Sequence, residues 1–371
     1  MVMTLRRTSK RTRLGIDMGG GGLRIVRLER GGGGFVIAAA AQVEAPPSSD
    51  DTAAQYRTRA QFLRGLVSGL SRKGESCMVG LSPPDIEFFS LDLPAAAIRT
   101  GGPELANVVR WEVERLMTTK PDHLETRHWT LPATSAPAPS VIAVGTGREA
   151  ATEAAAICRL AGVHCQGVDT SATALSRFGC LLRNWPSDVI WGLLDLGQRH
   201  VRLVLCLRDV PVLIRTVGTG GAELTKRIAE SLQISAKAAE LHKREHGIAT
   251  SHPIGRRQSD EADGSELGGL IASAVRPDLN SLVSEIKRSY SYILSCYPGK
   301  QAGDLVLVGG GADLRNLPDF LTNGLGISVQ TASAYAGNNA SRMEKPDPSL
   351  PPLERLALAV GLAVPAEVEN D

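Results

Sequence analysis

The chain has 371 residues, of which 43% are hydrophobic and only 4% are aromatic. This length allows two or three packed domains at about 100–200 residues each. The formal net charge of +2 predicts neither a nucleic-acid groove nor a strongly acidic ligand surface.

The charge is unevenly distributed along the chain. Residues 1–13 carry +5, which leaves −3 on the rest, and the basic residues are Arg6, Arg7, Lys10, Arg11 and Arg13. We interpret residues 1–13 as a basic, flexible, solvated tail, because basic N-terminal arms commonly behave in this way. A weak contact with anionic lipid is the alternative interpretation.

Membrane-spanning and disulfide-rich classes are not predicted. The most apolar stretch, Leu356 to Val364, is shorter than the about 20 residues that a spanning helix needs. The basic start leads into a strand and glycines, which is not the pattern of a signal peptide. The six cysteines form no CxxC pair and predict small core residues in a reducing cytosol, not disulfides or metal ligands: Cys77, Cys158, Cys165, Cys180, Cys206 and Cys296.

The first part of the chain, residues 14–84, predicts one α/β unit. Strands over Leu14–Gly19, Leu23–Glu29 and Phe35–Val43 read as a β-meander with a glycine turn in its first hairpin. A helix from Ala53 to Ser71 follows, and Cys77–Leu81 is a short buried strand.

The pattern of residues 85–167 predicts a module inserted into the first domain. Residues 168–188 are expected to belong to the first domain again. The module is expected to contain strands and helices over Ile86–Leu91, Glu104–Met117, Arg127–Leu131, Val141–Val144, 148–161 and 163–168.

The second domain, residues 189–336, repeats the opening pattern of the chain. Strands over Val189–Asp195, Val201–Leu207 and Val210–Thr216 reproduce the strand–turn–strand–strand order of residues 14–43, which indicates an internal duplication. A helical subdomain at about 222–300 is expected next, with helices over 222–233, 235–246 and 268–297. The strand 304–308, a loop over 337–352, a closing helix from 353 and an acidic tail ending at 371 complete the chain.

Three strand ends run into glycine, and two of them carry an aspartate. Asp17 precedes Gly19, Gly20, Gly21 and Gly22; Asp195 precedes Gly197; the third strand ends in Gly309, Gly310 and Gly311. Glycine permits the close backbone approach that a phosphate needs. Two carboxylates at one cleft suit a hydrated Mg²⁺, which takes a few carboxylates and water. The pattern predicts a two-domain nucleotide clamp.

Two further patterns are interpreted as structural. Gly145–Ala150 with Asp169 fits the dinucleotide fingerprint G-x-G-x-x-A, but the strands before it have an antiparallel pattern and no second βαβ half follows. His242–His246 fits H-x-x-E-H, the inverted zinc-hydrolase pattern. We interpret it as the polar end of a helix that Gly247 terminates, because no recognisable motif places a third ligand.

The order of these segments resembles the actin-like ATPase superfamily, and within it most closely the PilM family of type IV pilus assembly. The resemblance runs from about Leu14 to Val364, through two phosphate segments and an adenosine segment. The residues that carry it are Gly15–Gly19, Leu23–Leu28, Leu91–Pro94, Trp111–Glu114, Leu193–Gly197, Thr219–Thr225, Val306–Gly311, Leu317–Pro318 and Leu358–Ala363.

The resemblance implies an α/β actin-like fold, with two duplicated domains around a nucleotide cleft and an inserted subdomain of the FtsA and PilM type at 85–167. It implies that the cleft binds ATP or ADP with Mg²⁺, with Asp17 and Asp195 reaching the metal through water. The implied nucleotide-binding residues are Asp17, Gly19, Gly20, Gly21, Gly22, Arg24, Asp195, Gly197, Gln198, Gly220, Gly221, Glu223, Gly309, Gly310 and Gly311.

The chain departs from the family at both phosphate turns. The family usually has Ser or Thr after the first glycine, whereas this chain has Gly20, Gly21 and Gly22. Each missing hydroxyl contact costs about 0.5–1.5 kcal/mol, or up to about tenfold in affinity. Gln198, Arg199 and His200 replace small hydroxyl residues in the second turn. We therefore expect ATP binding with weak or absent hydrolysis.

The resemblance also implies a cytoplasmic scaffold that is peripheral to the inner membrane through a partner. PilM-like proteins bind the cytoplasmic N-terminal peptide of the membrane protein PilN and join other platform components, in a pilus or type II-like secretion system. A small-molecule kinase of the same superfamily and an FtsA-like division filament are the alternatives. The kinase requires an acceptor pocket and a carboxylate near the attacking hydroxyl. The filament requires a terminal membrane helix, where this chain has an acidic end at 365–371.

Overall fold

The computed structural model describes residues 13–31, 34–45, 52–72, 74–118, 123–248, 262–336, 341–344 and 347–365. The predicted basic tail, apart from Arg13, and the acidic end beyond 365 therefore lie outside the described residues. Among the described residues, no helix is long and apolar enough to cross a membrane.

The first sheet is built on the meander that the sequence predicts. It has the order β3-β2-β1-β4-β8, in which β1, β2 and β3 pair antiparallel and β1, β4 and β8 pair parallel. Its strands are β1 (Arg13–Gly19), β2 (Gly22–Arg30), β3 (Phe35–Glu44), β4 (Ser76–Leu81) and β8 (His164–Thr170).

The second sheet has the same topology as the first. Its order is β11-β10-β9-β12-β13, again an antiparallel meander followed by two parallel strands. Its strands are β9 (Val189–Leu196), β10 (His200–Leu207), β11 (Val210–Thr219), β12 (Gln301–Val308) and β13 (Val329–Thr331). The repeat of strand directions and order confirms the duplication that the sequence indicates.

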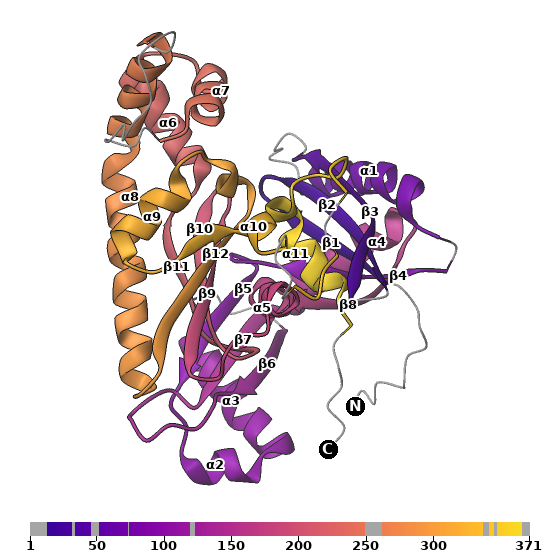
Figure 1. Ribbon diagram of the computed structural model, residues 1–371. Helices are drawn as coiled ribbons and strands as arrows, with labels where there is room; N and C mark the ends of the chain where they lie inside the picture. The colour runs from indigo at the N-terminus through magenta and orange to yellow at the C-terminus, as the bar shows by residue number, and fades with distance from the viewer. Residues whose placement is uncertain are drawn as a thin grey trace.

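Helices cover the sheets and fill the space between them (Figure 1). Against the first sheet lie α1 (Thr52–Leu70) and α4 (Arg148–Leu160), which share one apolar cluster with it. The long α8 (Ala262–Cys296) packs on the second sheet, with α6 (Gly221–Leu232) and α7 (Ala236–His246) at one end and α9 (Leu317–Leu325) beside it. A third cluster joins both sheets through α5 (Ser171–Leu182), α10 (Ala332–Ala336) and α11 (Leu353–Ala363).

A separate small sheet forms the part of the molecule farthest from α6 and α7 (Figure 1). It has the antiparallel order β5-β7-β6. Its elements are β5 (Ile86–Leu91), α2 (Ala95–Thr100), α3 (Gly102–Leu116), β6 (Leu124–Thr130) and β7 (Val141–Gly147).

The inserted module is smaller than the 85–167 that the sequence predicts. Strand β8 pairs with β4 in the first sheet, and α4 packs in that sheet's apolar cluster. Both elements therefore belong structurally to the first α/β unit, and only about 86–147 forms the small sheet. Sequence periodicity assigns a strand but not the sheet in which it pairs. The sequence also did not predict α2, α5, α9 (Leu317–Leu325), α10 (Ala332–Ala336) and the short strand β13.

Helix α11 is almost wholly buried between the two sheets. It contacts β1, β2 and β4 of the first sheet and β12 of the second. Glycine allows this approach on both partners. A Cβ on Gly15 would lie 1.8 Å from the carbonyl oxygen of Ala359, and one on Gly361 would lie 1.9 Å from the carbonyl oxygen of Ala174 in α5.

Substitution at this contact tests how tightly α11 is fitted. We expect Gly361→Ala to lower the free energy of unfolding by about 1–3 kcal/mol, because the new methyl group overlaps the backbone of α5. Gly65→Ala is the control, since Gly65 lies exposed in α1 with nothing within 4 Å of an added Cβ. It should stabilise by about 0.5–1 kcal/mol through helix propensity. Urea unfolding of both variants measures the difference, and equal effects would contradict the packing argument.

Candidate functional site

A cavity of about 800 Å³ lies where the two sheets face each other. Most of the predicted residues line it: Asp17, Gly19, Gly20, Gly21, Arg24, Asp195, Gly197, Gln198, Gly221, Gly309, Gly310 and Gly311. The folded chain therefore brings together three strand ends that are about 100–300 positions apart in the sequence.

Three predicted residues do not line the cavity. Gly22 adopts φ +148°, and an added Cβ would lie 2.3 Å from the carbonyl oxygen of Val43, so it makes the hairpin turn possible. A Cβ on Gly220 would lie 2.4 Å from the carbonyl oxygen of Gln198. Glu223 lies in the first turn of α6, where it pairs with Arg227 at 3.9 Å.

Each sheet contributes a buried aspartate paired with an arginine from the next strand. Asp17 on β1 lies opposite Arg24 on β2, and Nη1 of Arg24 donates to Oδ2 of Asp17 at 2.9 Å. Asp195 on β9 lies opposite Arg202 on β10, which donates to it in the same way. Both pairs span seven positions. The two hairpins have the same antiparallel register, so each places an arginine opposite the aspartate that lies seven positions before it.

The arginines retain unused donors and the carboxylates repel each other. The Nε atoms of Arg24 and Arg202 are buried and have no hydrogen-bond partner. Burial raises the pKa of Asp17; the Arg24 guanidinium opposes this, and the negative charge of Asp195 adds to the increase. The site thus has two buried arginine donors without a partner, and two carboxylates whose repulsion a cation would relieve.

The first and second glycine turns face each other closely. A Cβ on Gly20 would lie 3.7 Å from both the Gln198 amide oxygen and Cδ of Arg199. The third turn approaches the same point: Gly309 adopts φ +84°, and its Cβ would lie 2.6 Å from Oδ1 of Asp195. Glycine is therefore required at 309, whereas position 20 has room for a side chain.

Helix α7 supplies charged residues that the sequence reasoning missed. Lys243, Glu240 and Arg244 line the cavity. Nζ of Lys243 donates to Glu240 at 2.6 Å, to Oγ1 of Thr225 at 2.7 Å and to the Gly221 carbonyl oxygen at 3.0 Å. Burial lowers the pKa of Lys243, and the ion pair with Glu240 only partly offsets it. The i, i+3, i+4 spacing of 240, 243 and 244 was the available signal, because it places these residues on one helix face.

The H-x-x-E-H pattern marks this same helix. Its two imidazoles lie 5.7 Å apart, and donor atoms of His242, Glu245 and His246 lie within 4.8 Å of one another. The two residues between the histidines, Lys243 and Arg244, line the cavity.

The remaining acidic turn residue is already held by an arginine. Nε and Nη2 of Arg355 contact Oδ2 of Asp313, at 2.7 and 2.5 Å. Glu354, which is buried at the start of α11, accepts hydrogen bonds from the backbone N–H and hydroxyl of Ser333.

The dinucleotide-like segment is part of the small sheet. Strand β7 pairs antiparallel with both of its neighbours, so Gly145–Ala150 does not follow a parallel βαβ strand. Asp169 forms an ion pair with Arg177 and accepts a hydrogen bond from Thr173. The geometry agrees with a structural role for this motif.

Comparison with known proteins agrees with the duplicated fold. The model of the cell division protein FtsA matches residues 192–349. The PilM-PilN type IV pilus biogenesis complex is similar with a TM-score of 0.72 and 23% identity, covering 96% of this chain and 98% of that one. The chain has the actin-like ATPase fold. The ethanolamine utilization protein EutJ from Carboxydothermus hydrogenoformans is also similar, with a TM-score of 0.55, 16% identity and coverage of 97% and 91%. The actin-like, PilM-like interpretation of the sequence is thus confirmed for the fold.

The raised pKa of Asp17 predicts the pH dependence of stability. An unfolded aspartate has a pKa of about 3.9, so between that value and the higher folded pKa the folded chain binds more protons. The contribution of Asp17 is therefore present below about pH 4 and is lost as pH rises through the folded pKa, with a slope of at most about 1.4 kcal/mol per pH unit. We expect the difference in unfolding free energy between wild type and Asp17→Asn to fall as pH rises from about 4 through the folded pKa. Urea unfolding at a series of pH values measures this difference.

Asp347→Asn is the matched control for this titration. The N–H of Ser349 donates to Asp347 and lowers its pKa, so its stabilising contribution is lost as pH falls. The difference in unfolding free energy between wild type and Asp347→Asn should therefore rise with pH, whereas the difference for Asp17→Asn should fall. A flat profile for Asp17→Asn would contradict the assignment of a raised pKa.

Proposed function

We propose that this actin-like chain is a nucleotide-binding scaffold at the cytoplasmic face of a type IV pilus or type II-like secretion platform. The observation that carries the proposal is the pair of matching Asp–Arg turns that face each other across one cavity. Binding of ATP or ADP between the two units would favour their closed arrangement. Such a population shift requires no turnover of the nucleotide.

The residues at the turns suit the phosphates and Mg²⁺. The backbone N–H groups of glycine turns form anion-binding concavities, and the unpartnered Nε atoms of Arg24 and Arg202 are further donors at the same wall. Asp17 and Asp195 face the cavity together and would reach Mg²⁺ through its water shell. The bound metal would neutralise charge on the phosphates and relieve the repulsion between the carboxylates.

The α7 side of the cavity suits the nucleoside. Glu240 is an acceptor at this wall and is held in place by Lys243, whose three N–H donors all bond within the protein. The backbone of Gly310 and Gly311 lines the same cavity. Nothing lies within 4 Å of an added Cβ at Gly310, so the chain leaves open space there. We assign the ribose and base to this region, with Gly221 at the junction to the phosphates.

Ion pairing at the aspartates favours a scaffold over a small-molecule kinase. A kinase needs a carboxylate free to accept the proton of the attacking hydroxyl. Asp195 is paired with Arg202, and Asp313 is held by Arg355. Neither turn residue is free to act as that base, which supports binding with weak or absent hydrolysis.

The partner assigned to the scaffold is the cytoplasmic N-terminal peptide of a PilN-like membrane protein. The similarity to a PilM-PilN complex over 96% of the chain supports this assignment. The protein would then be cytoplasmic and held at the inner membrane through that partner and other platform components.

Calorimetry with ATP tests the proposal. We expect micromolar binding in the presence of Mg²⁺, and Asp17→Ala or Asp195→Ala should weaken it by about 10- to 100-fold, because each removes a charge-assisted contact. With the metal chelated, the same variants should bind ATP no worse than wild type, since their arginines are released. Asp319→Ala, an exposed position outside the cavity, is the control.

Failure of the well-folded wild type to bind ATP or ADP would contradict the nucleotide part of the proposal. The partner is tested separately, by titrating a synthetic cytoplasmic N-terminal peptide of a PilN-like membrane protein, with and without ATP. Peptide binding without nucleotide binding would leave a nucleotide-free scaffold. The absence of both would overturn the function.

Restoring a hydroxyl at the first turn should strengthen binding. We expect Gly20→Ser to raise ATP affinity by up to about tenfold, because one added hydrogen bond contributes about 0.5–1.5 kcal/mol and the nearest atoms to an added Cβ lie at an ordinary 3.7 Å. Gly22→Ser is the control that should fail, since its Cβ would overlap the Val43 carbonyl oxygen. Equal affinities of wild type and Gly20→Ser would place the phosphates away from this turn.

A further inference from the structure

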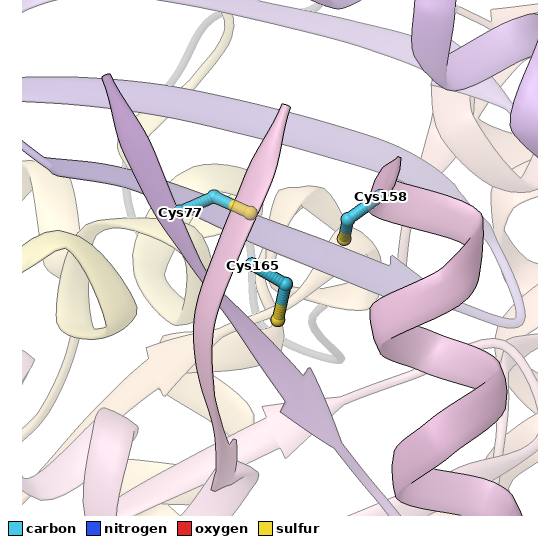
Figure 2. A group of neighbouring side chains, drawn as sticks. All are labelled: Cys77, Cys158 and Cys165. Carbon is cyan, nitrogen blue, oxygen red and sulfur yellow. The ribbon is translucent and has the colours of Figure 1, made fainter. Parts of the chain in front are cut away.

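Three cysteines that are far apart in the sequence meet inside the first α/β unit. Cys77 lies on β4, Cys165 on β8 and Cys158 on α4, and their sulfur atoms all lie within 4.8 Å of one another (Figure 2). Cys77 and Cys165 are register partners on adjacent parallel strands. Figure 2 shows both of their side chains on the side of the strands where α4 and Cys158 lie.

The surroundings of the three thiols are apolar and nearly closed. Cys77 and Cys158 are 0% exposed, whereas Cys165 is half-buried and provides the route to solvent. The neighbouring side chains belong to the apolar cluster of β1, β4, α1 and α4. Among the described residues, no histidine or carboxylate belongs to this group of three thiols. His164 is exposed and points to the opposite face, because side chains alternate along a strand.

Donor type and number restrict what this group can bind. Thiolates select soft ions, chiefly Cu(I) and Zn²⁺. Structural Zn²⁺ is almost always four-coordinate, and here a fourth ligand would have to be water in an apolar core. Three sulfurs at about 2.3 Å from a central ion would be about 4.0 Å apart, which is compatible with three sulfurs that all lie within 4.8 Å of one another.

We propose that Cys77, Cys158 and Cys165 form a three-thiolate site for a soft, low-coordinate metal ion, Cu(I). Binding displaces thiol protons to solvent and changes no oxidation state. The ion would join β4, β8 and α4 at one point. Cys77 is the register partner of Leu14, and Gly80 on the same strand that of Asp17, so the site would stabilise the sheet that carries the first aspartate.

Competition with a chromophoric Cu(I) chelator tests the proposal on the full chain, reduced and kept without oxygen. We expect one Cu(I) per chain, thiolate-to-copper absorption in the ultraviolet, and a higher melting temperature with the ion bound. Cys165→Ser should lower the affinity by at least about tenfold. Because Cys165 is half-buried, this variant disturbs the core least. Cys77→Ala removes a second ligand and should also weaken Cu(I) binding, and circular dichroism checks that this variant is folded.

Cys180→Ser is the matched control, since Cys180 is also half-buried but lies outside the group. It should bind Cu(I) as wild type does. Equal Cu(I) affinities of wild type and Cys165→Ser would overturn the site, as would wild type that takes no copper from the chelator. Zn²⁺ binding as tightly as Cu(I) would overturn the assignment of a three-coordinate soft ion. A disulfide among the three cysteines in the reduced, oxygen-free chain would also contradict it.

Discussion

The close contact of α11 with both halves of the molecule is the constraint on which the cleft depends. Nearly every residue from Leu353 to Ala363 is buried, and the helix touches the first sheet at Gly15 and α5 at Gly361 without any intervening side chain. A hydrogen bond from the Gly309 N–H to the Glu354 carbonyl oxygen, at 2.8 Å, ties the same helix to the third glycine turn. Because Asp17 lies two residues after Gly15, the position of α11 also fixes where the first carboxylate meets the second.

The matching ion pairs give the cleft its electrostatic character. A carboxylate buried beside another carboxylate is costly unless each has a partner, and Arg24 and Arg202 provide one partner each. Each arginine keeps an unpartnered buried donor at the same time. The arrangement is therefore balanced within the protein, yet has capacity for an anion and a cation together. This combination supports the proposed binding of a nucleotide together with its metal.

The first sheet carries two groups with different chemistry on neighbouring strands. Asp17 lies near the end of β1 and lines the cleft, whereas Cys77 lies at the start of the adjacent strand β4 among apolar side chains. The hard oxygen donors are at a polar, accessible wall, and the soft sulfur donors are in a nearly closed core. A nucleotide and a thiophilic ion would therefore not compete, although both would act on the rigidity of one sheet.

The sequence by itself determined the local elements, the duplication and the glycine-terminated strands, because periodicity, turn residues and the spacing of Asp17 and Asp195 are local properties of the chain. It also sufficed for the actin-like fold. Only the tertiary structure decided that β8 pairs in the first sheet, because pairing depends on contacts between residues distant in sequence. It likewise revealed the Asp–Arg pairs, since strand register is set by the turns and by packing. Glu240 and Lys243 were missed because they lie on the helix whose H-x-x-E-H pattern was interpreted as structural. The three cysteines have no spacing motif, because two strands and a helix bring them together only after folding.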